Sequence, residues 1–232
     1  MNRFFAPLLT SEDQEYQLDG QEAIHCITVL RKDLGDQIEL INGKGLLAKG
    51  EIVEIHKKKG CKIQIESSLQ KDNFPETHLA IAPTKNSDKI EWLIEKASEL
   101  GISKVSFLIC NNNERQKINN KRLNKIIVSA AKQSGRLHFL QIEDPIPIFT
   151  FIKKYPNGVI AHCRNSSKIP LKSLSKSCPF LIGPEGDFTK EEIEFAEQNG
   201  YKSISMGVQR LRTETAGLSA SVILSQISGV LK

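Results

Sequence analysis

The chain has 232 residues, of which 39% are hydrophobic and 25% charged, a balance typical of a folded globular protein. This length suits one large domain or two small ones, and no apolar stretch is long enough for a transmembrane helix. The first residues lack the long apolar core of a signal peptide, so we expect no membrane association and a cytoplasmic location.

Charge is distributed unevenly along the chain. Residues 1–70 carry a net charge of −2, and residues 71–232 carry +7. Within the second part, residues 115–136 include seven Lys and Arg and no Asp or Glu. A basic strip favours phosphate-rich partners, because each neutralised phosphate releases counterions. A solvated helix face has the same composition, so both interpretations stay open at this point.

The cysteine pattern argues against a disulfide framework and against a zinc ribbon. The five cysteines are an odd number, lie far apart and form no C-x-x-C motif: Cys26, Cys61, Cys110, Cys163 and Cys178. This usage favours a reducing compartment. We therefore expect no metal site and a cytoplasmic protein.

The first 70 residues are predicted to be rich in β-structure. Asn42-Gly43-Lys44-Gly45 lies between two apolar segments, and Asn-Gly accepts the positive φ angles of a hairpin turn. Closely spaced strands with turn residues between them favour a small barrel. We predict strands at 37–41, 46–55 and 61–67 and one short helix at 20–30.

After a predicted linker at 71–75, strands and helices alternate. Residues 87–101 have the apolar spacing of an amphipathic helix, and Gly101 is suited to end it. Trp92 shares that helix with apolar neighbours and is predicted to lie in the core. The alternation indicates an α/β domain with a mostly parallel sheet. Further strands are predicted at 78–82, 105–110, 159–162 and 179–182, and a further helix at 119–134.

Residues 181–220 contain two glycine loops, each after a short apolar strand. Gly183-Pro184-Glu185-Gly186 follows the first strand, and Met206-Gly207 follows the second, predicted at 202–206. Between them, Thr189 with Glu192 forms the capping box of a helix that ends at Gly200. The final helix is predicted at 216–231, capped by Thr213 or Thr215.

Both loops are expected at the carboxyl ends of parallel strands, where α/β sheets bind ligands. A lone glycine loop is a weak signal, but here it is paired with the charged run Arg210-Leu211-Arg212-Thr213-Glu214-Thr215. The sequence therefore predicts a pocket of backbone groups and a few charges. The common dinucleotide, phosphate-loop, hydrolase and zinc motifs are absent.

The residues of these loops resemble the ribosomal RNA small subunit methyltransferase E family, within the trefoil-knot (SPOUT) methyltransferases. The matching motifs are Gly183-Pro184-Glu185-Gly186, Met206-Gly207 and Arg212-Thr213-Glu214-Thr215-Ala216. Similar stretches run through the chain in the family's order: 24–31 with Gly35-Asp36, Lys85, 96–101 and 133–136. The chain departs from the pattern at Asp187, where a glycine is usual, and at Lys132, Met206 and Arg210.

The resemblance implies an α/β fold with two domains and a homodimer. Residues 1–72 would form a PUA-like β-barrel that binds RNA, and residues 73–232 an α/β-knot (trefoil-knot, SPOUT) methyltransferase domain. The implied reaction moves a methyl group from S-adenosyl-L-methionine to N3 of a uridine in 16S rRNA, near the decoding centre of the assembled small subunit. Such a transfer needs neither a metal nor a covalent enzyme intermediate.

The resemblance also implies roles for individual residues. Arg212 would stabilise charge or contact RNA, unless it forms a salt bridge with Glu214. Glu185 and Glu214 would accept the proton from the uridine, or would only hold loop amides. The cofactor would be held by Ile182, Gly183, Pro184, Glu185, Gly186, Ser205, Met206, Gly207, Leu211, Arg212, Thr215 and Ala216. RNA would be contacted by His25, Arg31, Lys85, Arg115, Lys121, Arg122 and Arg136.

Two other functions stay open on the sequence. A non-catalytic RNA-binding or ribosome-assembly factor would be expected to lose the cofactor loops, which look intact here. A nucleotide-dependent enzyme would need a phosphate-binding lysine or magnesium-binding acids beside the glycine loop, and Pro184-Glu185 is a poor phosphate cradle.

Overall fold

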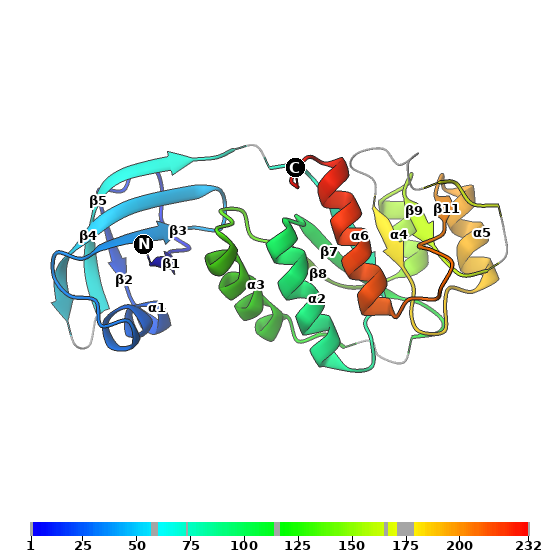
Figure 1. Cartoon of the computed structure of the whole chain (residues 1–232), viewed down its shortest axis with the longest axis horizontal. Helices are drawn as coiled ribbons and strands as arrows, with labels where there is room; N and C mark the ends of the chain where they lie inside the picture. Colours follow the sequence, from blue (N-terminus) through cyan, green and yellow to red (C-terminus); the bar gives the residue numbers. More distant parts are fainter. Residues whose placement is uncertain are drawn as a thin grey trace. The chain divides into compact units, whose positions relative to one another are not determined.

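The computed structural model describes residues 2–56, 60–72, 74–113, 117–164, 167–170 and 179–231 (Figure 1). The chain divides into two compact units. The first comprises residues 1–74 together with 131–139, and the second comprises 75–130 and 140–232. Within the described ranges, no helix is both long and apolar enough to cross a membrane.

The first unit is built on a five-stranded sheet of order β1-β3-β4-β5-β2. Strands β1 and β3 pair in parallel, and the other neighbours pair antiparallel. A short helix, α1 (Gly20–Ile24), continues into a π-helical turn at His25–Val29. The strands are β1 (Arg3–Phe5), β2 (Glu15–Leu18), β3 (Gln37–Ile41), β4 (Leu46–His56) and β5 (Gly60–Gln70).

The predicted hairpin turn between β3 and β4 is confirmed. Asn42 Oδ1 accepts hydrogen bonds from the backbone N–H groups of Lys44 at 2.8 Å and Leu46 at 3.1 Å. Gly43 has φ 76°, a conformation that glycine adopts at little cost. Apolar residues alternate along the strands and form the core of this unit, which includes Phe4, Leu18, Ile38, Leu40, Ile52 and Ile63.

The end of helix α3 (Asn120–Ser134) and the residues after it pack with the first unit. Lys132 Nζ lies 2.8 Å from Glu22 Oε2 and 5.6 Å from the centre of the Phe4 ring. Glu22 also accepts the N–H of Phe5 at 3.1 Å. The lysine that departs from the family pattern therefore pairs with a carboxylate on α1.

The second unit contains a six-stranded, fully parallel sheet of order β11-β9-β10-β6-β7-β8. Its central strands are buried along their whole length and almost entirely apolar, as expected for strands covered on both faces. The strands are β6 (His78–Ile81), β7 (Lys104–Ile109), β8 (Gln141–Pro147), β9 (Val159–Ala161), β10 (Phe180–Ile182) and β11 (Lys202–Ile204).

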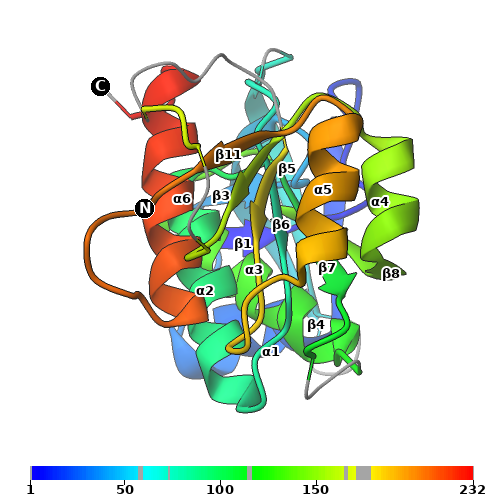
Figure 2. The same cartoon turned by 90° about the vertical axis from the view of Figure 1, so that its right-hand side faces the viewer.

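Helices cover both faces of this sheet. Figure 2 shows α2 (Ser87–Leu100) and α6 (Thr213–Ile227) on one side and α4 (Ile148–Lys154) and α5 (Lys190–Gln198) on the other. Contacts between α2 and α6, and between α4 and α5, agree with this arrangement. The α/β architecture with a parallel sheet is therefore as predicted.

Local signals fixed two helix ends correctly. Gly101 ends α2 with φ 78°, and Thr189 and Glu192 form the complete capping box of α5. Two other predictions were wrong. The last helix begins at Thr213 with Arg212 as its N-cap residue, and no side chain caps it. Trp92 is 42% exposed rather than buried, because α2 turns only one stripe toward the sheet.

Candidate functional site

A cavity of about 550 Å³ lies at the carboxyl ends of β9, β10 and β11, three adjacent strands of the parallel sheet. Its wall consists of three loops, one after each strand. They contribute residues from the ranges 161–168, 182–187 and 205–216. Chain order and sheet order differ here, since β9 lies between β11 and β10. Parallel pairing thus brings three separate segments to one edge, where α/β folds bind ligands.

The loop after β10 needs its glycines for close packing. A Cβ atom on Gly183 would approach the Phe188 ring to 3.1 Å, and one on Gly186 would approach Asn112 Cβ to 2.9 Å. The N–H of Asp187 donates to the carbonyl of Pro184 at 2.9 Å, which closes the turn. Asn112 Nδ2 donates to the carbonyls of Gly186 and Asp187 at 3.3 and 2.9 Å. The loop is therefore held in place by contacts that its neighbours make with its backbone.

The loop after β11 is tied to the loop after β10. Arg210 Nη2 donates to the carbonyl of Glu185, and Thr213 Oγ1 donates to the carbonyl of Gly183 at 3.2 Å. Within the loop, Ser205 Oγ donates to the carbonyl of Gly207 at 2.9 Å. The two glycine loops predicted from the sequence therefore lie side by side in space.

Most residues predicted to hold the cofactor lie on this cavity. Two exceptions are Gly186, which adjoins the lining residue Asp187, and Thr215, which is exposed on α6. The predicted residues that line the cavity are Ile182, Gly183, Pro184, Glu185, Ser205, Met206, Gly207, Leu211, Arg212 and Ala216.

The three candidate catalytic residues are placed differently. Arg212 and Glu185 are exposed and line the cavity. Glu214 is not among the lining residues, and its Oε1 lies 3.1 Å from Lys89 Nζ on α2. The alternative salt bridge between Arg212 and Glu214 is therefore wrong, because Glu214 is paired with another helix. Within the described residues, the Arg212 side chain has no hydrogen-bond or ion-pair partner.

The loop after β9 was missed by the sequence prediction. It contributes Ala161, His162, Cys163 and Lys168 to the cavity wall. His162 is buried, and its Nε2 lies 2.9 Å from Ser203 Oγ, which donates to Glu197 Oε1 at 2.6 Å. Burial, with a smaller contribution from nearby Lys168, lowers the pKa of His162. The sequence did contain a signal for this loop, because residues 159–162 were predicted to form a strand. Ligands bind at the carboxyl ends of parallel strands, so the loop after this strand could have been included with the two glycine loops.

The residues predicted to contact RNA lie outside this cavity. Arg31 is exposed with φ 53°, and His25 packs edge-on against Phe4 with ring centres 5.9 Å apart. Lys85 and Lys121 are exposed, Arg122 Nε lies 3.1 Å from Glu91 Oε2, and Arg115 lies outside the described residues. Arg136 is half-buried, and burial lowers its pKa.

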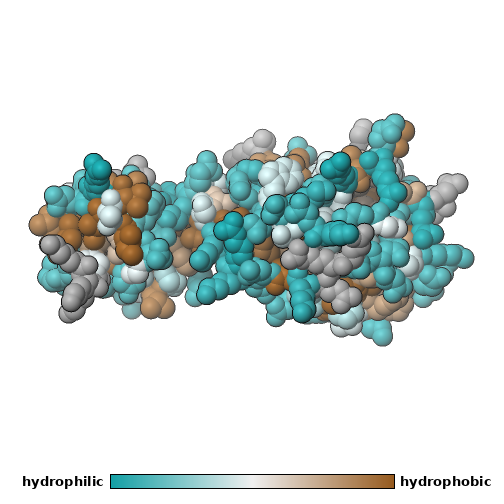
Figure 3. Space-filling view, turned by 90° about the horizontal axis from the view of Figure 1, so that it is seen from below, coloured by the Kyte–Doolittle hydropathy of each residue, from teal (hydrophilic) through white to brown (hydrophobic). Residues whose placement is uncertain are grey.

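The surface near His25 and Arg31 also carries apolar side chains. Ile24 is 52% exposed and Val29 is 62% exposed. Figure 3 shows brown, apolar areas on the first unit, on the left of the view. This surface therefore combines basic and apolar side chains.

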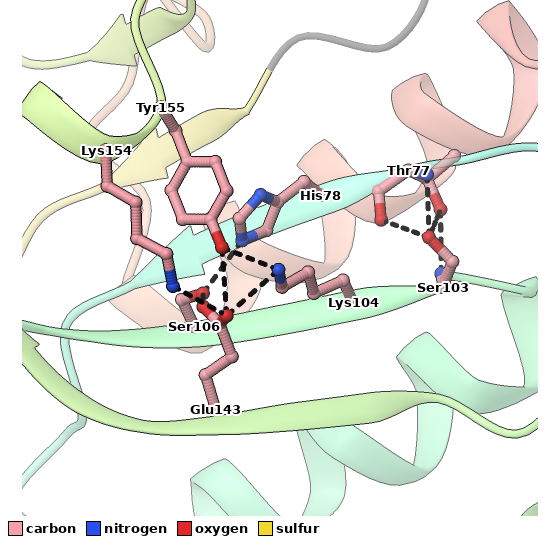
Figure 4. Close-up of polar contacts among 8 residues, drawn as sticks. All are labelled: Thr77, His78, Ser103, Lys104, Ser106, Glu143, Lys154 and Tyr155. Atoms are coloured by element: carbon pink, nitrogen blue, oxygen red, sulfur yellow. Dashed lines mark hydrogen bonds and ion pairs between the residues drawn. The ribbon is translucent and has the colours of Figure 1, made fainter. Parts of the chain in front are cut away.

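A polar network that the sequence did not reveal lies at the opposite, amino-terminal edge of the sheet (Figure 4). It is centred on Glu143 of β8, whose Oε1 accepts hydrogen bonds from Tyr155 at 2.9 Å and lies 2.9 Å from Lys104 Nζ. Ser106 Oγ donates to Glu143 Oε2 at 2.5 Å and lies 2.8 Å from His78 Nε2. The network therefore joins β6, β7, β8 and the end of α4.

The network shifts two pKa values strongly. Burial lowers the pKa of His78 to about 4, with a further contribution from the positive charge of Lys104. Burial alone would raise the pKa of Glu143, but hydrogen bonds from four neighbouring side chains outweigh it and hold the pKa at about 2. At neutral pH the network therefore contains a neutral histidine and a carboxylate.

The chemistry of the cavity is that of a small-molecule site built largely from backbone groups. The glycine loops bring backbone groups to the cavity wall, which suits a flat, polar ligand, and Arg212 adds a cation that has no partner among the described residues. No group of His, Cys, Asp and Glu in the described part of the chain is arranged to hold a metal ion. The pocket is thus suited to binding, orientation and charge stabilisation.

Comparison with known proteins identifies the family. A family model of an RNA methyltransferase domain matches residues 71–225, and a model of an RNA methyltransferase PUA domain matches residues 18–66. Ribosomal RNA small subunit methyltransferase E of Rickettsia conorii is 33% identical over 228 residues, covering 94% of this chain and 93% of that protein.

Solved structures agree with these matches. A probable rRNA-methyltransferase of Porphyromonas gingivalis is 33% identical, with a TM-score of 0.90 and full coverage of both chains. Ribosomal RNA small subunit methyltransferase E of Neisseria gonorrhoeae, bound to S-adenosyl methionine, is 25% identical, with a TM-score of 0.83 and 98% coverage of both chains. The chain belongs to the ribosomal RNA small subunit methyltransferase E family.

Proposed function

We propose that the protein transfers a methyl group from S-adenosyl-L-methionine to N3 of a uridine in 16S rRNA, near the decoding centre of the assembled small subunit. The observation that carries the proposal is the cavity at the ends of β9, β10 and β11, whose wall includes two glycine loops and Arg212, an arginine with no partner among the described residues. The names of its relatives support the RNA substrate and the cofactor.

The residues of the cavity fit this cofactor. The volume of the cavity, about 550 Å³, is within the range of small-molecule sites. At Gly207 there is open space where a Cβ atom would stand, so a ligand can approach its backbone closely, and Ile182, Leu211 and Ala216 supply apolar contacts. The bound cofactor would supply an electrophilic methyl group on a positively charged sulfur.

The protein's own residues must then handle one proton and one negative charge. The N3–H proton leaves the uracil, the N3 lone pair forms the new N–C bond, and the electrons of the broken C–S bond stay on sulfur. Arg212 would stabilise the negative charge that develops on the uracil. Glu185 would accept the proton, since it is exposed at the cavity. Glu214 would hold α6 to α2 through Lys89.

Several finer features belong to the same proposal. The first unit would be a PUA-like barrel, the second unit would be threaded as a trefoil knot, and residues 1–72 and 73–232 would be the two domains. The protein would act in the cytoplasm, where the small subunit is assembled. A homodimer is supported by aliphatic residues of α6 that are only half-buried in the single chain: Leu218, Val222, Ile223 and Ile227.

The decisive experiment is mass mapping of 16S rRNA from cells that lack the gene. Loss of one methyluridine, restored by the wild-type gene, is the expected result. An unchanged map would refute the assignment of substrate. Calorimetry with S-adenosyl-L-methionine separates the enzyme from a ribosome-assembly factor, because only the enzyme is expected to show heat of binding.

A further inference from the structure

Asp187 directly follows Gly186 of the glycine loop after β10, and its φ is 64°. This left-handed conformation favours glycine, although Asp and Asn tolerate it better than other residues. The residue also lines the cavity. An aspartate at this position therefore carries a small cost in backbone conformational free energy. The contacts of its carboxylate indicate what offsets that cost.

Both carboxylate oxygens of Asp187 accept backbone N–H groups. Oδ2 accepts the N–H of Cys163 in the loop after β9 at 2.9 Å, and Oδ1 accepts the N–H of Phe188 at 2.9 Å. Hydrogen bonds to a charged acceptor are stronger than those between neutral groups. The first of these bonds joins two walls of the cavity that are distant in sequence.

A second contact runs beside the first. Arg164 Nε donates to the carbonyl of Phe188 at 2.9 Å, so residues 163–164 are bonded to residues 187–188 at two successive positions. Lys168 Nζ then donates to the carbonyl of Arg164 at 2.8 Å. Since Cys163 and Lys168 both line the cavity, these contacts fix the position of its third wall.

The loop after β10, which carries Asp187, is itself held by other hydrogen bonds. Asn112, in the turn after β7, donates to the Gly186 and Asp187 carbonyls, while Thr213 of α6 donates to the Gly183 carbonyl. The loop after β10 is therefore held from two other directions. The loop after β9 is held to β11 by the hydrogen bond from the Ile169 N–H to the Ser203 carbonyl at 2.9 Å. Its Cys163 N–H reaches the anchored loop after β10 through the Asp187 side chain.

We propose that Asp187 is a positioning residue that fastens the loop after β9 to the loop after β10 and thereby preorganises the cofactor pocket. The inference rests on the proposed function for the identity of the ligand, and on the hydrogen bonds alone for the connection itself. Without the carboxylate, binding would have to order the segment around Cys163, and that cost would appear as weaker affinity.

Three variants test the proposal. Asp187→Gly removes the carboxylate and suits the left-handed backbone, so it isolates the side chain without added strain. Asp187→Asn retains one acceptor oxygen and tolerates the same backbone. Arg164→Lys leaves Asp187 intact and removes the neighbouring Nε donor. Thermal unfolding of each variant without ligand checks that it folds.

Two measurements are made on the full-length protein. Amide hydrogen exchange at Cys163 reports the hydrogen bond directly, and calorimetry gives the Kd for S-adenosyl-L-methionine. In Asp187→Gly we expect amide exchange at Cys163 to be at least about tenfold faster. We expect the Kd to rise about three- to tenfold, because binding must then order one or two additional side chains or peptide groups. Asp187→Asn should fall between this variant and the wild type, and Arg164→Lys should weaken binding less.

The outcomes distinguish this inference from the proposed function. Unchanged exchange at Cys163 in Asp187→Gly would overturn the connection between the loops. Faster exchange with an unchanged Kd would overturn its role in binding. If the wild-type protein bound no S-adenosyl-L-methionine, the proposed function would fail, and exchange at Cys163 would still decide whether Asp187 joins the two loops.

Discussion

Thr213 Oγ1 donates a hydrogen bond to the carbonyl of Gly183 at 3.2 Å, so the first residue of α6 is bonded to the glycine loop after β10. Thr213 is buried, and its hydroxyl serves this contact instead of capping its own helix. The arrangement explains how α6 and the glycine loop after β10 keep their relative positions.

Replacing Thr213 by Val is expected to lower the free energy of unfolding by about 1–2 kcal/mol, because the shape is kept while the Gly183 carbonyl loses a buried donor. The loss is measured by urea denaturation. Thr213→Ser keeps the hydroxyl and is the matched control. A free energy of unfolding that is unchanged in Thr213→Val would show that this hydrogen bond does not stabilise the protein.

Replacing Arg212 by Ala is expected to abolish methylation of small subunits in vitro, a loss of at least about a hundredfold if the guanidinium stabilises the uracil anion. The side chain is exposed and unpaired in the described part of the chain, so the fold should stay intact. Circular dichroism and thermal unfolding check this. Wild-type activity in the variant would refute the role of Arg212.

The two candidate proton acceptors can be separated by a pair of isosteric variants. Glu185→Gln removes a carboxylate from the cavity and should lower the methylation rate about a hundredfold at neutral pH. Glu214→Gln weakens only the ion pair to Lys89, a partly exposed pair worth about 1 kcal/mol or less, and should retain most of the activity. A lower methylation rate in Glu214→Gln than in Glu185→Gln would assign proton acceptance to Glu214 instead.

Acid should destabilise the protein in two successive pH ranges. The pKa of His78 is about 4 in the folded protein, below its ordinary 6.5, so the unfolded chain binds more protons between pH 6.5 and 4 and stability falls as pH falls. The pKa of Glu143 is about 2 instead of 4.5, so its contribution is present above pH 4.5 and is lost as pH falls toward 2.

His78→Gln tests the upper of these ranges, since glutamine keeps a polar group near Ser106 but does not titrate. Between pH 6 and 4.5, each proton taken up on unfolding changes the free energy of unfolding by about 1.4 kcal/mol per pH unit. The slope for the variant should therefore be smaller by up to this amount. Parallel curves for the two proteins would show that His78 does not titrate in this way.

Local sequence determined those features that depend on neighbouring residues. The Asn42 turn, the Gly101 helix end and the Thr189–Glu192 capping box were predicted correctly because each is a contact within a few residues. The alternation of apolar strands and amphipathic helices predicted the α/β class for the same reason. The two glycine loops were recognised because each follows its strand directly.

Tertiary structure decided which distant residues meet. The sequence placed Glu214 beside Arg212, but the packing of α6 on α2 pairs it with Lys89. Strand order is not encoded locally, so only the sheet shows that β9 lies between β11 and β10 and brings His162 and Cys163 to the cavity. The contact of Asp187 with Cys163 depends on that order. The sequence by itself determined the loops of this site, and the order of the parallel strands determined how they form one pocket.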